Sequence, residues 1–321
     1  DQNTAVPFKN SLKHFNVTMD DWLIDSTSAT DTSRFYLLKD LSLQLNDYQL
    51  ATADSLYYVQ ANSMKFRAST GVLDIKRLSL IPRYDEMEFG KKPGSRKDRF
   101  SLELNNLDFK GIDLPLYVKR QELMAREMNI SHGRIAVFCN NEIQSPDKPV
   151  KTLFPHQLLQ TIAAKITIGK LNLSHFDVHY SEYNTERKEK GKISFERTSG
   201  WISNITNVAL QKEKNPMMEA KLKTYLMGQG ELETNFKFNL LAPDGAFSYS
   251  GTLHGLNGTV LNGITKPLGM VHIKSGMVKK LQFDIAANAR QAKGKMEFNY
   301  HDLAIAVLKK DAGDPWYSRQ G

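Results

Sequence analysis

Two histidines, His175 and His179, lie four residues apart, and their spacing could in principle support metal chemistry. On an α-helix this spacing puts both rings on one face, where they could bind a zinc ion. The residues around them alternate between apolar and polar, however, and that period is typical of a β-strand. Four residues along a strand span about 13 Å, which is too far for two ligands of one ion. The sequence therefore does not favour a zinc site.

Other catalytic and nucleotide-binding motifs are also missing from the sequence. The glycines Gly255 and Gly258 are not followed by the Lys-Ser/Thr pair of a phosphate-binding loop, and we expect no helix after them. There is no G-x-S-x-G nucleophile elbow, and no pair of carboxylates lies in an apolar strand. The single cysteine, Cys139, is interpreted as a strand residue near a turn. We expect a protein that is not an enzyme, with no catalytic residue, metal or cofactor.

The charge balance is basic, with 43 Lys and Arg against 35 Asp and Glu and a net charge of +8. Part of the excess lies in residues 91–99, which we interpret as a solvated hairpin loop. The same cations could contact phosphate groups of anionic lipid, lipopolysaccharide or nucleic acid. We expect no nucleic acid, since no aromatic residues are interleaved with them. The candidates for contact with anionic headgroups are Lys91, Lys92, Arg96, Lys97 and Arg99.

The length of 321 residues allows one elongated domain or two ordinary ones, and 40% of the residues are hydrophobic. No window approaches the roughly 18 apolar residues of a membrane span. The chain starts at Asp1 and shows no charged-then-apolar leader, so we expect a mature fragment from which an upstream anchor could have been removed. One cysteine excludes an internal disulfide.

Alternation with a period of two dominates the chain and predicts β-strands. The leucine-rich pattern at residues 41–50 recurs at 100–109 and, more loosely, at 171–180, without the fixed period of a solenoid. The same half-buried surface is therefore built repeatedly along a sheet. In the C-terminal fifth, residues 249–308, the pattern predicts a meander with turns at Gly276, Gly294 and the His301-Asp302 pair. The expected strands there are 271–273, 281–285, 296–300 and 303–307.

Earlier in the chain the pattern predicts many short strands and two short helices. The helices are expected within residues 112–124, where Pro115 is near the start, and at 155–164, where Pro155 is the first residue. The expected strands are 14–19, 22–25, 41–50, 64–68, 72–75, 78–80, 100–109, 128–130, 135–138, 165–168, 170–183, 192–195, 201–210, 218–227, 231–241 and 246–253.

A polar, proline-rich stretch at residues 140–155 interrupts this pattern and predicts either a subdomain linker or a long hairpin loop. We accordingly divide the chain into an N-terminal β-rich part, residues 1–145, and a C-terminal meander, residues 146–311, continuous with the first. Residues 312–321 form an irregular tail.

The burial of so many amphipathic strands poses a problem, because two short helices cannot cover them. The sheet could close on itself as a sandwich or barrel. It could instead curl into a trough whose apolar inside is covered by acyl chains, since each buried methylene contributes roughly 0.8 kcal/mol. Alternation alone does not choose between these solutions. We predict a mainly β fold with a long curved antiparallel sheet, shaped like a taco or half-barrel, and two short helices.

The C-terminal motifs carry a resemblance to a known family. A segment with the sequence NGITKPL at residues 262–268 is followed by a strand ending in Ser-Gly at residue 276, a strand Leu-Gln-Phe at 281–283, and residues 289–303 ending in His-Asp-Leu. This order resembles the C-terminal region of AsmA-like proteins. The match covers about a fifth of the chain, and a looser match, which includes residues 109–113 and 166–180, extends over most of it.

The resemblance implies a periplasmic protein of a Gram-negative bacterium, tethered to the inner membrane by an N-terminal helix that this sequence does not include. It also implies an elongated β-rich groove, as in bridge-like lipid transfer proteins, and a role in phospholipid transport or outer-membrane homeostasis. A trough this short could not span the periplasm alone.

The expected function is therefore non-enzymatic lipid handling or outer-membrane assembly, with phospholipid or another acyl-chain lipid as partner. The alternative is a structural or interaction scaffold of the envelope with a closed, dry β core. The candidates for lipid contact are Leu171, Leu173, Val178, Phe236, Phe238, Val271, Ile273, Leu281, Phe283, Ile285, Phe298 and Ile305.

Overall fold

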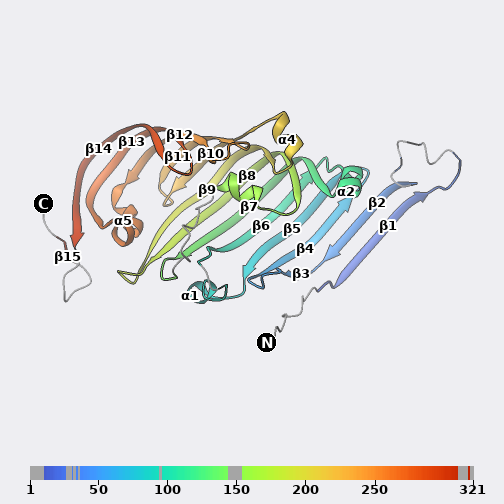
Figure 1. Cartoon of the computed structure of the whole chain (residues 1–321), viewed down its shortest axis with the longest axis horizontal. Helices are drawn as coiled ribbons and strands as arrows, with labels where there is room; N and C mark the ends of the chain where they lie inside the picture. The colour runs from blue at the N-terminus through green and yellow to red at the C-terminus, as the bar shows by residue number, and fades with distance from the viewer. Residues whose placement is uncertain are drawn as a thin grey trace.

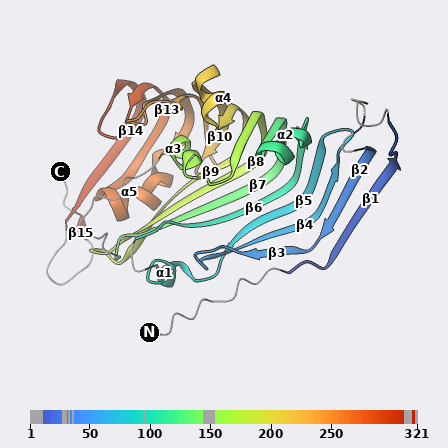
Figure 2. The same cartoon turned by 45° about the vertical axis from the view of Figure 1, so that its right-hand side comes forward.

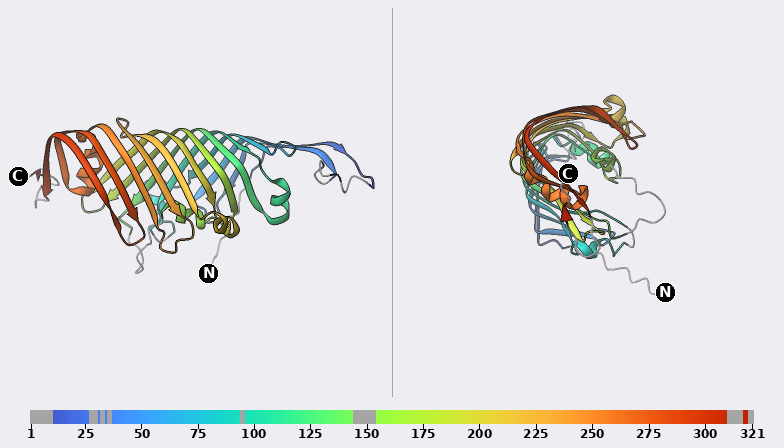
Figure 3. Two further views of the ribbon diagram at one scale, coloured as in Figure 1. Left: turned by 90° about the horizontal axis from the view of Figure 1, so that it is seen from above. Right: turned by 90° about the vertical axis from the view of Figure 1, so that its left-hand side faces the viewer.

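A computed structural model of the chain shows one long, twisted sheet that curls into an open half-barrel (Figure 1). The structure describes residues 11–26, 31, 34, 37–93, 96–143, 154–309 and 317–318. The chain is mainly β, and its long sheet is not closed into a barrel, so the predicted fold class is confirmed. Viewed end-on, the sheet forms an arc that is open on one side (Figure 3, right).

The strands follow one another across the sheet almost in chain order, with β3 as a side branch that pairs with β4. Their bounds are β1 His14–Trp22, β2 Leu38–Asn46, β3 Tyr48–Ala51, β4 Tyr57–Arg67, β5 Val72–Pro82, β6 Arg99–Lys110, β7 Glu122–Asn140, β8 Lys165–Asn184, β9 Glu189–Thr206, β10 Met217–Leu226, β11 Gly230–Asn239, β12 Phe247–Asn257, β13 Val271–Ala287, β14 Ala292–Lys309 and β15 Tyr317–Ser318.

One connection departs from the antiparallel pattern, because β7 and β8 pair in parallel from Glu122↔Lys165 to Asn140↔Tyr183. A parallel pair needs a crossover that returns the chain to the starting end of the sheet. The stretch predicted at 140–155 is therefore not a hairpin loop; residues 144–153 of it lie outside the described residues. The predicted division at residue 145 falls within this crossover, and the sheet continues across it.

Many predicted strands are pieces of longer ones. The segments 72–75 and 78–80 are one strand, β5, and all four C-terminal segments belong to β13 and β14. Gly276 and Asp302, predicted as turns, have positive φ angles of 141° and 52° within strands, and Gly294 also lies inside β14. A single left-handed residue makes a bulge that bends a strand without ending it. The segment 22–25 is not a separate strand, since β1 ends at Trp22.

The bulges have a recurring sequence pattern, in which two polar residues separate two apolar ones. Asn106 lies between Leu104 and Leu107 with φ 52°, and both leucines join the same buried cluster. His175 has φ 50° between Leu173 and Phe176, which pack against that cluster too. The extra residue keeps the apolar side chains on one face while the strand bends, and bent strands curl the sheet.

Helices are more numerous than predicted. The two expected ones are α2 (Leu114–Arg120) and α3 (Pro155–Gln160), and both begin with proline in the first turn. Those not predicted are α1 (Glu86–Phe89), α4 (Ala209–Lys214), the 3₁₀ turn η1 (Gly258–Leu261) and α5 (Asn262–Gly269). No helix in the described ranges has both the length and the apolar content of a membrane span.

The expectation that no helix follows Gly258 is wrong, because η1 and α5 follow it directly. The composition of α5, with two glycines and Pro267, is typical of a turn, and side-chain bonds stabilise the helical form instead. Asn257 accepts a hydrogen bond from the Thr259 backbone at 3.1 Å, and Asn262 exchanges two 2.8 Å bonds with the backbone of Ile273.

Candidate functional site

One face of the sheet carries an apolar row that crosses every strand from β1 to β14 except β3. Each member is the direct cross-strand partner of the next, so the row is a property of the register. The row consists of Val17, Leu43, Phe66, Leu73, Phe109, Met128, Leu171, Ile202, Ala220, Phe236, Tyr249, Ile285 and Gly294.

A second row runs beside it, two residues further along each strand and on the same face. Its members are Phe15, Leu45, Met64, Ile75, Leu107, Ile130, Leu173, Gly200, Leu222, Thr234, Gly251, Phe283 and Met296. No member of either row carries a charge. Together the rows form a continuous apolar surface along the whole sheet.

The opposite face is polar at the same level. Its row consists of Asn16, Gln44, Lys65, Asp74, Asp108, Asn129, Asn172, Trp201, Lys221, Asn235, Ser250, Asp284 and Lys295. Trp201 is the one large apolar ring in this row, and the Lys170 ammonium lies 6.0 Å from its centroid. The two faces therefore meet different surroundings.

The apolar face is the inside of the curl, which we call the concave face. Figure 3 shows α5 in orange within the arc at one end of the sheet. The preceding turn η1 packs Val260 and Leu261 against Leu253 and Leu256 of β12. Near the middle, α3 also covers this face, since the His156 ring lies 4.9 Å from that of Phe238 (Figure 2).

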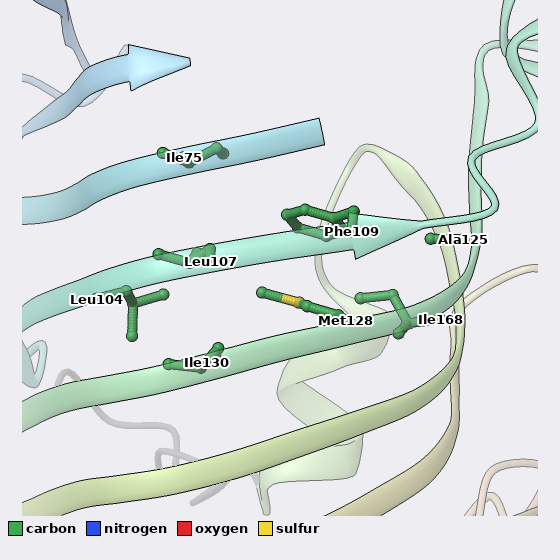
Figure 4. Packing of buried hydrophobic residues seen from close by; sticks show 8 residues of the cluster. All are labelled: Ile75, Leu104, Leu107, Phe109, Ala125, Met128, Ile130 and Ile168. Carbon is green, nitrogen blue, oxygen red and sulfur yellow. The ribbon is translucent and has the colours of Figure 1, made fainter. Parts of the chain in front are cut away.

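Between these covers, the described residues that line the concave face belong to strands, apart from Ile112. The central cluster comprises residues of β5, β6, β7 and β8, and Leu107 at its centre is 1% exposed (Figure 4). Of the residues that pack around it, only Ile112 lies outside a strand. Neighbours such as Leu73, Leu171 and Ile202 remain half-buried. Toward the ends of the sheet, Val17 and Met296 are exposed.

The twelve predicted lipid-contact residues lie together on this face. Leu171, Phe236 and Ile285 belong to the first row, and Leu173 and Phe283 belong to the second. Leu281 and Phe298 are partners between β13 and β14, Phe238 packs under α3, and Val178 follows the bulge of β8. Val271, Ile273 and Ile305 lie beyond further bulges, where Ile273 pairs with Ile305 and contacts η1.

Sequence reasoning missed other residues of the concave face, such as Phe109, Met128, Ile202 and Tyr249. Their alternation was recognised, but alternation does not say which strands are neighbours. The signal that could have found them is the pair of polar residues between apolar ones, which marks a bulge and keeps the phase of the inward residues across it.

The basic loop at 91–99 lies next to α1, at the ends of the strands that are opposite α2 and α4 (Figure 1). Lys91 pairs with Glu88 at 2.7 Å, and Lys97 lies 3.9 Å from Asp54. Lys92 stacks over the Tyr84 ring, and Arg99 donates to the Tyr84 carbonyl at 3.1 Å. These cations are thus engaged within the protein.

The fifth cation of this loop, Arg96, contributes to a polar cluster where β7 and β8 end. Its Nη2 donates to the Cys139 sulfur at 2.8 Å, yet burial raises the pKa of the Cys139 thiol to about 11. The Tyr180 hydroxyl donates to Glu182 at 2.7 Å, and burial together with this carboxylate raises the pKa of Tyr180. A thiol with a raised pKa is a poor nucleophile, so Cys139 is structural.

The histidines do not assemble a metal site. His175 stacks on His132, with ring centroids 5.0 Å apart, and within the described residues no cluster of His, Cys, Asp and Glu side chains could hold a metal ion. His156 is buried among Phe154, Phe238 and Phe247, and neither ring nitrogen has a hydrogen-bond partner in this part of the structure. Burial lowers the pKa of His156.

The site is therefore an extended apolar surface without a polar focus. Such a surface can desolvate long apolar groups. No protein-family model matches the chain, and a search of curated proteins found no match.

Proposed function

We propose that this protein is a non-enzymatic lipid-handling module of the AsmA-like type, in which acyl chains lie against the concave face. The observation that carries the proposal is the pair of uncharged rows that cross the open sheet from β1 to β14. Half-buried leucine, isoleucine and aromatic side chains lie there, and removing their exposed surface from water is favourable.

The chemistry of an acyl chain suits this surface. A methylene chain needs no hydrogen bonds, and each methylene removed from water contributes roughly 0.8 kcal/mol. A row that is apolar along its full length binds such a chain without fixing its position, so the chain can move along the sheet. A charged headgroup would stay on the open side of the arc, where water is accessible.

The cellular setting of the proposal comes from the C-terminal resemblance to AsmA-like proteins. It supports a periplasmic location, a tether to the inner membrane outside this sequence, and a role in phospholipid transport or outer-membrane homeostasis. The curved sheet supports the same type of protein, since a β-rich groove is what the resemblance implies.

The experiment is extraction of the purified protein followed by mass spectrometry for bound phospholipid, together with binding of a fluorescent phospholipid. Leu171→Glu puts a charge on the concave face, and Asn172→Glu puts the same charge on the next residue, which faces outward. We expect bound phospholipid in the wild type and in Asn172→Glu, and weak binding in Leu171→Glu. Circular dichroism checks the fold of each variant.

A second pair guards against misfolding of the central variant. Ile285 is half-buried in the first row, and Ala286 is exposed on the outer face. Ile285→Glu should weaken binding and Ala286→Glu should not. Absence of lipid in all folded proteins would contradict the proposal and favour a scaffold without a ligand.

A further inference from the structure

Three short helices, α2, α3 and α4, lie along one long rim of the curled sheet, opposite the rim that carries α1 (Figures 1 and 2). Side-chain bonds connect them into one surface. Lys165, at the start of β8, pairs with Glu122 beside α2 at 3.3 Å. Asn207 donates to the carbonyls of Ile162 and Ala164 after α3, and Lys212 of α4 donates to Gln160 of α3 at 2.8 Å. We call this surface the helical rim.

The helical rim carries apolar side chains that remain exposed to solvent. Tyr117 and Val118 of α2 are 43% and 41% exposed, Ile162 is 46% exposed, and Leu210 of α4 is 57% exposed. Unlike the exposed residues of β1 and β14, they are not part of a row that stops at a sheet edge. They point outward from connections between strands, where polar residues are the usual choice.

Cations accompany these apolar side chains. Lys119 and Arg120 follow Tyr117 and Val118 directly, and Lys214 ends the helix that begins beside Leu210. All three are exposed, and within the described residues none of them forms an ion pair. On the opposite rim, by contrast, the cations of the 91–99 loop are engaged by Glu88, Asp54 and Tyr84.

We propose that the helical rim docks on the surface of an anionic bilayer. Single apolar residues next to lysine and arginine match the boundary between headgroups and acyl chains, because the apolar part can enter the boundary while the cation stays at the phosphates. A protein partner would instead be expected to meet a continuous apolar patch, and here the apolar residues are separated by charged ones.

The rim borders the open side of the arc, so a docked bilayer would adjoin the concave face. The idea that lipid enters the concave face from a bilayer docked on this rim rests on the proposed function, whereas the docking itself does not. The proposed binding partner of the rim is a lipid surface with negatively charged headgroups.

Flotation with vesicles tests the proposal. The vesicles are phosphatidylcholine alone, or phosphatidylcholine with about 30% phosphatidylglycerol. We expect the wild type to float with the anionic vesicles and not with the neutral ones. Two variants should lower the bound fraction at least about tenfold: Tyr117→Ser with Leu210→Ser, and Lys119→Glu with Arg120→Glu and Lys214→Glu. The control, Lys91→Glu with Lys92→Glu on the opposite rim, should bind as the wild type does.

Binding of a monomeric fluorescent phospholipid separates the two claims. Rim variants that lose vesicle binding and keep this lipid support docking by the rim. If rim variants float like the wild type, or if the wild type ignores anionic vesicles, the docking proposal is overturned. If the wild type floats with anionic vesicles but does not bind the monomeric phospholipid, the proposed function alone is overturned.

Discussion

Two buried titratable side chains, His156 and Cys139, show how the apolar surroundings act on single residues. Cys139 lies at the end of β7, where burial raises its pKa even though a guanidinium touches the sulfur. His156 is the first-turn residue of α3 that anchors this helix among aromatic rings on the concave face. In both cases the neutral form is the one that the fold accommodates.

Replacing His156 by phenylalanine should remove a loss of stability in acid. Burial depresses the pKa of the folded state, so the unfolded chain takes up the proton first as the pH falls below about 6.5. The contribution of His156 to stability is therefore complete above that pH and is lost as the pH decreases toward the folded-state pKa. Urea unfolding at pH 7.5, 6.0 and 5.0 measures the effect.

The wild type should lose free energy of unfolding across this series, and His156→Phe should lose less, since a phenyl ring fills the same aromatic cluster without a proton to bind. An equal decline in both proteins would show that His156 is not the residue responsible.

At the scale of elements, the bulges explain where sequence reasoning failed. Glycine and aspartate, the residue types at positions 276 and 302, are common in turns. The sequence alone does not distinguish a residue that ends a strand from one that bends it. The difference depends on whether a neighbouring strand pairs on both sides of the bulge, as β13 and β14 do here. Helices α2 and α3 could be predicted because proline in the first helical turn is a local signal.

Gly200 tests the importance of one positive-φ residue within a strand, β9. Its φ is 141°, and a Cβ added there would lie 2.1 Å from the Lys221 carbonyl oxygen of the neighbouring strand. Gly200→Ala should therefore lower the free energy of unfolding by about 2–3 kcal/mol, measured by urea denaturation. Gly269→Ala is the control, because no atom lies within 4 Å of the added Cβ there. Equal stability of the two variants would contradict this account of Gly200.

At the scale of the whole molecule, the curved amphipathic sheet could be predicted from the sequence, whereas its order could not. Alternation specifies two faces for each strand, and the shortage of helices means that the sheet must either close on itself or curl into a trough. The parallel pairing of β7 with β8 and the register that aligns Leu171 with Met128 and Ile202 depend on contacts far apart in the chain. The candidate residues were therefore identified as a set, without the rows that connect them.

The central claim is that acyl chains contact the concave face and not the outer face. Photo-crosslinking from neighbouring positions on one strand tests it most directly, with benzoylphenylalanine at Leu171 or Asn172 of β8 and at Phe236 or Asn235 of β11. After irradiation with phospholipid vesicles, mass spectrometry should find lipid adducts at positions 171 and 236 and none at 172 and 235. Adducts at both members of each pair, or at the outward members alone, would contradict the account.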